Sequence, residues 1–126
     1  IDLIKKSYKK KVILIDRFTD STIAYQHYGM GVNLNIIKTL NKYLLKNIKV
    51  DFTFLNIVSK KNLYERLKKR KSLNRYDKFN MTFYNKVQNG FIKLSKLKKN
   101  KYKLINSNLD IKDNEKLILN KISKLI

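Results

Sequence analysis

Two spacings of hydrophobic residues alternate along the chain, and each predicts a different kind of secondary structure. Short continuous runs of apolar, β-branched and aromatic residues predict buried strands over residues 12–15, 51–58 and 102–105. Apolar residues spaced by three and four positions predict helices over residues 21–28, 34–46, 60–70, 79–91 and 111–126.

The predicted helices begin and end at residues that suit those positions. The side chains able to cap their first turns are those of Asp20 or Ser21, Asn33 and Ser59. Gly29 and Gly31 are expected to end the first helix, because glycine readily adopts the left-handed conformation that follows many helices. The apolar side chains expected to face inward are Leu34, Ile37, Leu40 and Leu44; Phe79, Phe83, Val87 and Phe91; and Leu117, Ile118, Ile122 and Leu125.

The order of these elements predicts an α/β fold. Strands that alternate with helices favour a parallel sheet flanked by helices on both faces. Three strands make an incomplete sheet, and the chain begins at Ile1, without Met, inside a helical pattern. We therefore expect residues 1–126 to be the C-terminal part of one domain, with no linker or repeat dividing them.

Composition excludes several classes of protein and leaves the meaning of the charge open. The formal net charge is +21, carried by 26 Lys and 4 Arg. Lys, Asn, Ile, Tyr and Phe share A/T-rich codons, so this charge alone assigns no function. The chain has no Cys and a single His, His27, which excludes disulfides and Cys- or His-dominated metal sites. No apolar run approaches the ~20 residues of a membrane span, so no membrane association and a cytoplasmic location are expected.

Asp16 and Arg17 follow the first predicted strand, at the end where α/β sheets bind ligands. Arg can hold a phosphate through two hydrogen bonds, and a carboxylate can order a magnesium-bound water. On the next helix, hydroxyl, amide and aromatic groups share neighbouring faces and suit a nucleobase and sugar; they belong to Ser21, Thr22, Tyr25 and Gln26. A strand-end salt bridge beside an ordinary amphipathic helix explains the same spacing.

A second cluster consists of Arg66, Arg70 and Arg75, three of the four arginines in the chain. In a chain dominated by Lys, this choice suggests that the planar guanidinium is needed rather than charge alone. An Arg-bearing loop between helices is typical of a lid that closes over phosphates during phosphoryl transfer. The alternative is a solvated basic helix face.

Together these residues resemble the signature of thymidylate kinases, which has an Asp-Arg-aromatic step, a Ser, Ala-Tyr-Gln and a Gly-rich turn. The segments that carry the resemblance are Ile15-Asp16-Arg17-Phe18, Ser21, Ala24-Tyr25-Gln26 and Gly29. Weaker matches follow in the order of the family: Val50–Thr53, Arg66–Arg70, Asn74–Asp77, Val87–Phe91 and Ile105–Asn108.

The resemblance implies a P-loop nucleoside-monophosphate-kinase fold and transfer of the γ-phosphoryl of ATP to dTMP with Mg²⁺, giving dTDP. It implies that Arg17 grips the acceptor phosphate and that Asp16 helps to organise Mg²⁺ through water. Arg70 and Arg75 would be the lid arginines near the donor phosphates. The residues implied to line the thymine and deoxyribose pocket are Ser21, Thr22, Tyr25 and Gln26, and those near the adenine of ATP are Asn106 to Asn108.

The sequence also departs from the family pattern, at His27, Met30, Ile57, Asn74 and Gln88. The larger departure is that the chain lacks the phosphate-cradling loop G-x-x-x-x-G-K-[ST] that ATP binding requires. We expect that loop to lie before Ile1 and the 126-residue chain to be inactive by itself. The full-length protein is expected to be a homodimer, with the helix over residues 34–46 as part of its interface.

Two alternatives stay open at this point. A basic nucleic-acid-binding module would gather Lys and aromatic residues on one face, whereas here Lys is spread from Lys5 to Lys124, so no specific nucleic acid is expected. A nucleoside monophosphate kinase for another base is the second alternative, against which the Tyr25-Gln26 pair favours thymidylate.

Overall fold

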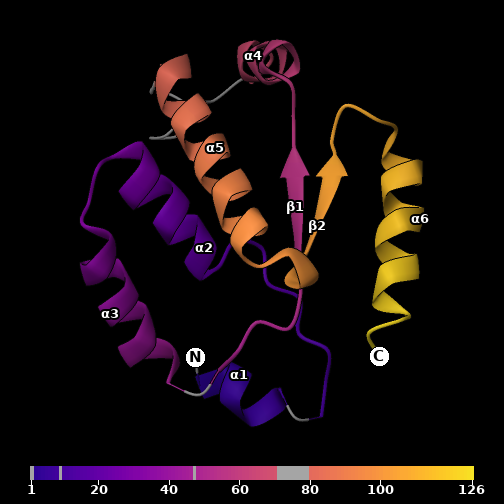
Figure 1. The fold of residues 1–126 in the computed structure, drawn as a ribbon. Helices are drawn as coiled ribbons and strands as arrows, with labels where there is room; N and C mark the ends of the chain where they lie inside the picture. Colours follow the sequence, from indigo (N-terminus) through magenta and orange to yellow (C-terminus); the bar gives the residue numbers. More distant parts are fainter. Residues whose placement is uncertain (1, 9, 47, 71–79) are drawn as a thin grey trace.

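The computed structural model of the chain describes residues 2–8, 10–46, 48–70 and 80–126 (Figure 1). Helices predominate around a small sheet. In chain order the elements are α1 (Asp2–Ser7), α2 (Thr19–Thr22), the π-helix η1 (Ile23–Gly29), α3 (Leu34–Leu45), β1 (Thr53–Ile57), α4 (Lys60–Lys68), α5 (Met81–Leu97), the 3₁₀-helix η3 (Lys99–Lys101), β2 (Tyr102–Asn106) and α6 (Ile111–Ile122).

The sheet consists of β1 and β2, which run parallel with Thr53 opposite Tyr102 and Ile57 opposite Asn106. Both strands lie within or close to the predicted ranges, so these two predictions are confirmed. A parallel pair needs a long crossover, which α4 and α5 supply. Figure 1 shows α5 beside β1 and α6 beside β2, so the two helices flank the sheet.

The third predicted strand, over residues 12–15, is not formed. Within the described ranges the sheet has only β1 and β2, and residues 12–15 take no regular structure. Val12 is 58% exposed and Leu14 77% exposed. A strand exists only as part of a hydrogen-bonded ladder, and no described segment lies alongside to complete one. The apolar run therefore predicted the wrong state.

The core lies mainly where α5 packs against η1. One cluster joins Ile23, Ile37 and Leu94, and another joins Ala24, Phe83 and Val87. The predicted inward positions Phe83 and Val87 of the long helix are thus confirmed, while Phe79 lies outside the described residues. The helix begins after Asn80, whose side chain accepts a hydrogen bond from the Phe83 amide at 3.0 Å.

Two glycines bring η1 and α5 unusually close together. A Cβ on Gly29 would lie 2.6 Å from the Phe83 ring, and one on Gly90 would lie 2.5 Å from the Tyr28 ring. Gly29 is the last residue of η1, as predicted, and its lack of a side chain also makes room for the Phe83 ring. The reversal comes at Gly31, where φ is +79°.

The expected cap of this helix by Asp20 or Ser21 is also wrong. The helix begins at Thr19, and Phe18 occupies the cap position without a side-chain hydrogen bond. Asp20 lies within the helix, and its carboxylate accepts a hydrogen bond from the Tyr102 hydroxyl instead of capping the first turn. By contrast, Asn33 and Ser59 cap α3 and α4 as predicted.

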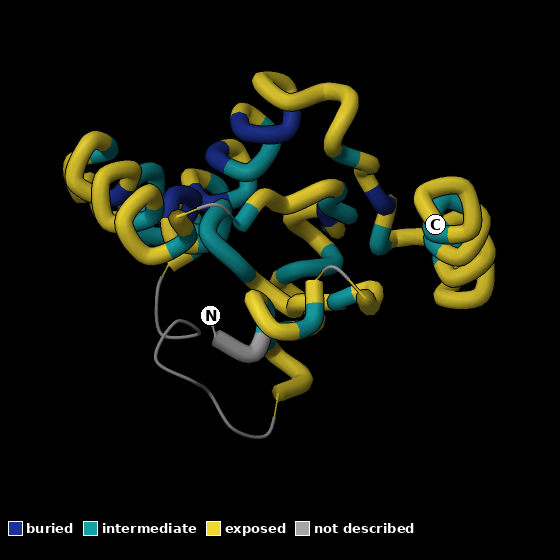
Figure 2. Tube along the Cα trace, turned by 90° about the horizontal axis from the view of Figure 1, so that it is seen from below, coloured by how far each residue is buried: buried dark blue, intermediate teal, exposed yellow. Residues whose placement is uncertain are grey.

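α3 and α6 are only partly packed, as the exposed turns in Figure 2 show. On α3, Ile37 is buried, but Leu40 and Leu44 are more than half exposed, contrary to their predicted inward position. α6 has no buried residue, and its predicted inward positions Leu117 and Leu125 are exposed. α3 packs mainly against η1, and α6 lies beside a sheet of only two described strands, so each helix has a small surface to pack against.

Candidate functional site

Arg17 occupies a strained position directly before the first turn of α2. Its φ is +60°, in the left-handed region that residues other than glycine seldom adopt. The side chain is exposed, and its guanidinium carbon lies 5.3 Å from the centroid of the Tyr25 ring. This is a cation–π contact, which holds the charge over the ring while leaving its N–H groups available for an anion. The structure thus brings two predicted site residues together.

Tyr25 is held in place by α5. Its ring meets Phe83 and Phe91 edge to face, with ring centroids 6.0 and 6.3 Å apart. The π-helical turn continues past it, where the Met30 amide donates to the Tyr25 carbonyl at 3.1 Å. Such turns widen a helix and recur at functional sites. Tyr25 is therefore a half-buried, fixed wall.

The remaining residues of the predicted acceptor pocket lie on the same helix. Ser21 and Gln26 are half-buried and Thr22 is exposed. Ser21 lies one helical turn before Tyr25, so the two can face one ligand. The structure thus keeps the four predicted residues on one continuous helix, with Arg17 just before it.

Asp16 is exposed beside Arg17. In the described part of the chain, no group of three or more His, Cys, Asp or Glu residues could enclose a metal ion. Mg²⁺ in phosphoryl-transfer sites is held by one or two carboxylates together with substrate phosphates. A single exposed carboxylate fits that donor set and does not fit a dedicated protein cage.

A polar network closes the carboxyl ends of the two strands. The Asn108 amide oxygen accepts hydrogen bonds from the Ser59 backbone at 3.1 Å and from the Asn62 side chain at 2.9 Å. The Asn106 amide oxygen accepts from Asn108 twice, through its backbone N–H at 3.0 Å and its side chain at 2.8 Å. Both predicted ATP-site asparagines are therefore engaged with the protein, and they shape the loop.

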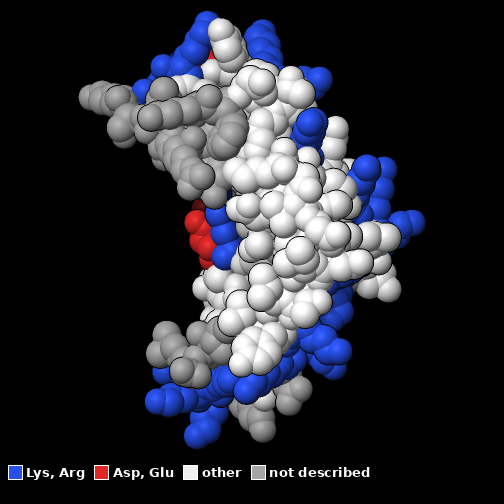
Figure 3. Space-filling view, turned by 90° about the vertical axis from the view of Figure 1, so that its left-hand side faces the viewer, with Lys and Arg blue, Asp and Glu red and all other residues white. Residues whose placement is uncertain are grey.

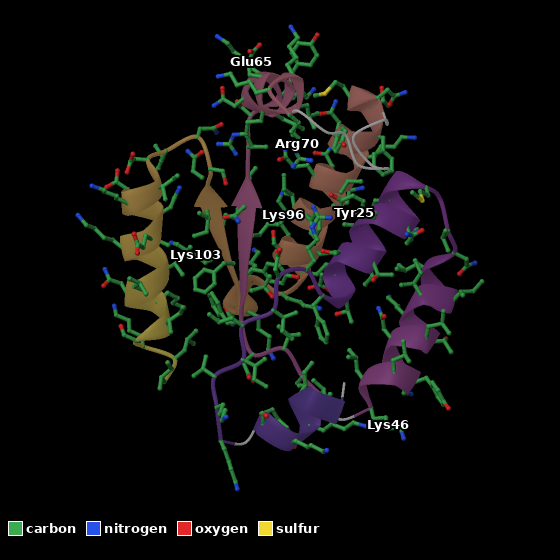
Figure 4. All side chains as sticks on the ribbon, turned by 180° about the vertical axis from the view of Figure 1, so that it is seen from behind. Tyr25, Lys46, Glu65, Arg70, Lys96 and Lys103 are labelled. Atoms are coloured by element: carbon green, nitrogen blue, oxygen red, sulfur yellow. The ribbon has the colours of Figure 1, made fainter. Side chains whose placement is uncertain are left out.

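The predicted lid arginines are only partly described. Arg66 on α4 donates to the Ser107 carbonyl at 2.6 Å, which ties α4 to the loop after β2. Arg70 lies just beyond α4, and Arg75 lies outside the described residues. Figure 4 labels Arg70 and Tyr25 and shows Arg70 on the side of Tyr25 toward α4.

Comparison with known proteins identifies the group to which these features belong. A family model described as thymidylate kinase matches residues 1–118. The chain belongs to the thymidylate kinase family. It is 36% identical over 118 residues to a thymidylate kinase of a Wolbachia endosymbiont of Brugia malayi, covering 91% of this chain and 55% of the relative. It is 34% identical to one from Acholeplasma laidlawii, covering 90% and 57%.

A solved structure agrees with the family assignment. The thymidylate kinase of Ehrlichia chaffeensis superposes with a TM-score of 0.59 and 30% identity, over 94% of this chain and 52% of that one. The α/β nucleotide-kinase fold predicted from the sequence is confirmed. The chain spans about half the length of the curated relatives it matches.

Two contacts close to this site are not predicted by the sequence. The Gln88 side chain, from α5, accepts a hydrogen bond from the Val58 backbone at 3.2 Å, directly after β1. Tyr102 donates a hydrogen bond to Asp20. Burial, and to a smaller extent this hydrogen bond, raises the pKa of Tyr102 well above its usual value. No short-range sequence pattern predicts either contact, because each contact joins segments far apart in the chain.

Charge and hydropathy add two further observations. On the face in Figure 3, Lys and Arg gather at the upper, right and lower margins around an uncharged centre. The face in this view is therefore not the continuous basic surface that a nucleic-acid-binding module would need. Within the described ranges, no helix is long and apolar enough to cross a lipid bilayer.

Proposed function

We propose that this chain supplies the acceptor site and lid of an enzyme that transfers the γ-phosphoryl group of ATP to dTMP. Membership of the thymidylate kinase family supports this role. The observation that carries it is the placement of the Arg17 guanidinium over the Tyr25 ring, at 5.3 Å. A cation presented at the rim of an aromatic wall suits a ligand that has both a phosphate and a flat sugar–base portion.

Each part of dTMP has a proposed partner on this helix. Arg17 binds the phosphate through its planar fork, which a point charge cannot reproduce. Tyr25 packs under the deoxyribose, where a 2′-hydroxyl would crowd the ring. Ser21, Thr22 and Gln26 supply hydroxyl and amide groups to the thymine edge and sugar. Catalysis of this kind depends on positioning and charge neutralisation more than on a base.

Other residues of the chain are proposed to serve the donor side of the reaction. Arg70 and Arg75 would approach the phosphates of ATP, and the loop of Asn106 and Asn108 would lie near its adenine. Asp16 would hold Mg²⁺ through a water molecule, and the metal would neutralise charge on the transferring phosphates. The asparagine network supports a role for the loop backbone, since the amide groups are already hydrogen-bonded.

The 126 residues contain no phosphate-cradling loop, so we expect the chain alone to bind dTMP without turning over ATP. Activity would require residues that supply this loop. We further propose a cytoplasmic homodimer. The exposed apolar side chains of α3, including Tyr43 at 74% exposed, support an interface there.

The decisive experiment is isothermal titration calorimetry of the 126-residue chain with dTMP, thymidine, dUMP and dGMP. We expect dTMP to bind most tightly and thymidine to bind less well, because it lacks the phosphate. Arg17→Lys should weaken dTMP binding about 30-fold, about 2 kcal/mol, by removing the fork. Lys38→Arg on the exposed side of α3 should change nothing.

Three results would redirect the proposal. Equal affinity for dTMP and thymidine would show that the site does not recognise the phosphate. Unchanged dTMP affinity in Arg17→Lys would leave Arg17 as a structural cation. Tighter binding of dGMP than dTMP would assign the site to a different nucleoside monophosphate.

A further inference from the structure

Three side chains from distant segments meet beside the acceptor site. The Tyr102 hydroxyl donates a hydrogen bond to one carboxylate oxygen of Asp20, and the Lys98 ammonium lies 3.5 Å from the other. Tyr102 is the first residue of β2, and Lys98 directly follows α5. We call these three residues the Asp20 latch, because they join the start of the acceptor helix to the sheet and to α5.

The hydrogen bond from Tyr102 is the stronger part of the latch. The Asp20 side chain is only 18% exposed, whereas that of Lys98 is 51% exposed. An exposed ion pair at this distance contributes little, while a hydrogen bond to a partly buried carboxylate contributes more. Burial and Asp20 both raise the pKa of Tyr102, and the hydroxyl of neighbouring Thr53 lowers it in part. Tyr102 therefore remains a donor at every physiological pH.

Asp20 lies only three residues after Arg17, whose backbone is strained. A left-handed conformation at a residue other than glycine persists only where the surrounding structure holds it. Residues 12–16 before Arg17 form no ladder, so they provide little restraint. The restraint must come from the other side, where Ile23 and Ala24 are buried and Asp20 is tied to Tyr102.

We propose that Tyr102 is a positioning residue for Arg17: through Asp20 it fixes the first turn of α2, and so holds the guanidinium over Tyr25 in place for the acceptor phosphate. This inference rests on the proposed acceptor role of Arg17. Tyr102 itself does not touch the substrate in this scheme. Tyr102 therefore affects recognition of the phosphate. Recognition of the nucleoside depends on the part of the helix around Ala24 and Tyr25, which packs against α5.

The test compares Tyr102→Phe, which keeps the ring and removes the hydroxyl, with Tyr8→Phe, at an exposed tyrosine just after α1. Two quantities are measured on the 126-residue chain. Calorimetry gives the affinities for dTMP and for thymidine, and nuclear magnetic resonance gives the chemical shift of the Arg17 Hε. Asp20→Asn serves as a second variant, because it preserves shape and keeps a weaker acceptor for the tyrosine.

We expect Tyr102→Phe to weaken dTMP binding by about five- to ten-fold, as for loss of one hydrogen bond to a charged group. Thymidine affinity should change less than about twofold, because the loss of the hydroxyl releases Arg17, and thymidine has no phosphate for Arg17 to bind. The Arg17 Hε resonance should move toward its position in an unfolded peptide. Asp20→Asn should show the same pattern with a smaller loss, and Tyr8→Phe should match the parent.

Equal loss of dTMP and thymidine affinity would make Tyr102 a general structural contact and overturn the inference. So would an unmoved Arg17 resonance in both latch variants. If the parent chain fails to bind dTMP, the proposed acceptor site fails, and the Arg17 resonance alone then tests the latch. A shift in Tyr102→Phe but not in Tyr8→Phe supports the latch, and no shift refutes it. If Tyr102→Phe does not fold, the same readings are taken from Asp20→Asn.

Discussion

Replacing Gly90 with alanine tests the contact that holds the acceptor helix against α5. A Cβ at this position would lie 2.5, 2.7 and 2.8 Å from Cδ2, Cγ and Cβ of Tyr28. The ring atoms could rotate, but the Cβ of Tyr28 moves only with its backbone. Overpacking of this kind costs about 3 kcal/mol, and alanine recovers about 1 kcal/mol through its higher helix propensity. We therefore expect Gly90→Ala to lower the free energy of unfolding by about 2 kcal/mol.

The matched control is Asn89→Ala, one residue earlier on the exposed side of α5. It gains helix propensity without the clash, by less than Gly90→Ala because asparagine is a better helix former than glycine, so it should stabilise the chain by about 0.5 kcal/mol. Urea unfolding followed by circular dichroism gives both values. Because Tyr25 lies on the displaced helix, Gly90→Ala should also weaken dTMP binding. A Gly90→Ala chain as stable as Asn89→Ala would refute the close approach.

Three further predictions concern the polar contacts. Burial and Asp20 raise the pKa of Tyr102, so the folded state binds the phenolic proton more tightly than the unfolded state does. The stability that this proton contributes is present below pH 10.0 and is lost as pH rises above that value. Between about pH 9 and about pH 11, urea unfolding should therefore show a smaller loss of stability for Tyr102→Phe than for the parent. Asn108→Ala removes the acceptor of hydrogen bonds of 3.1 and 2.9 Å from the start of α4, so it should cost about 1–2 kcal/mol in the same assay, and no loss would contradict the network. Arg66→Lys should weaken the 2.6 Å bond to the Ser107 carbonyl, and hydrogen exchange of the loop after β2 should become faster; an unchanged rate would count against this bond.

Local patterns predicted those features whose cause is local. Ser59 and Asn33 cap their helices as expected, because the side chain and the amide that it accepts from are two or three residues apart. The strands around Leu55 and Ile105 were likewise predicted, since both residues are buried within short apolar runs. The spacing of Arg17 and Tyr25 was enough to propose that they serve one ligand.

Errors arose where the outcome depends on a partner from elsewhere in the chain. The apolar run at Val12 has the composition of a strand, but a strand needs a neighbour to share its hydrogen bonds. Asp20 has the chemistry of a helix cap, yet its carboxylate pairs with Tyr102, 82 positions away.

The amino-acid sequence was enough to assign the family, to place two strands and the main helices, and to name the residues proposed to bind substrate. These features depend on side-chain chemistry and short-range spacing. Only the packed fold shows that Arg17 lies over Tyr25, that Asp20 accepts a hydrogen bond from Tyr102, and that Asn108 bonds to the start of α4. Such contacts depend on which distant surfaces are packed together, and packing is a property of the whole fold.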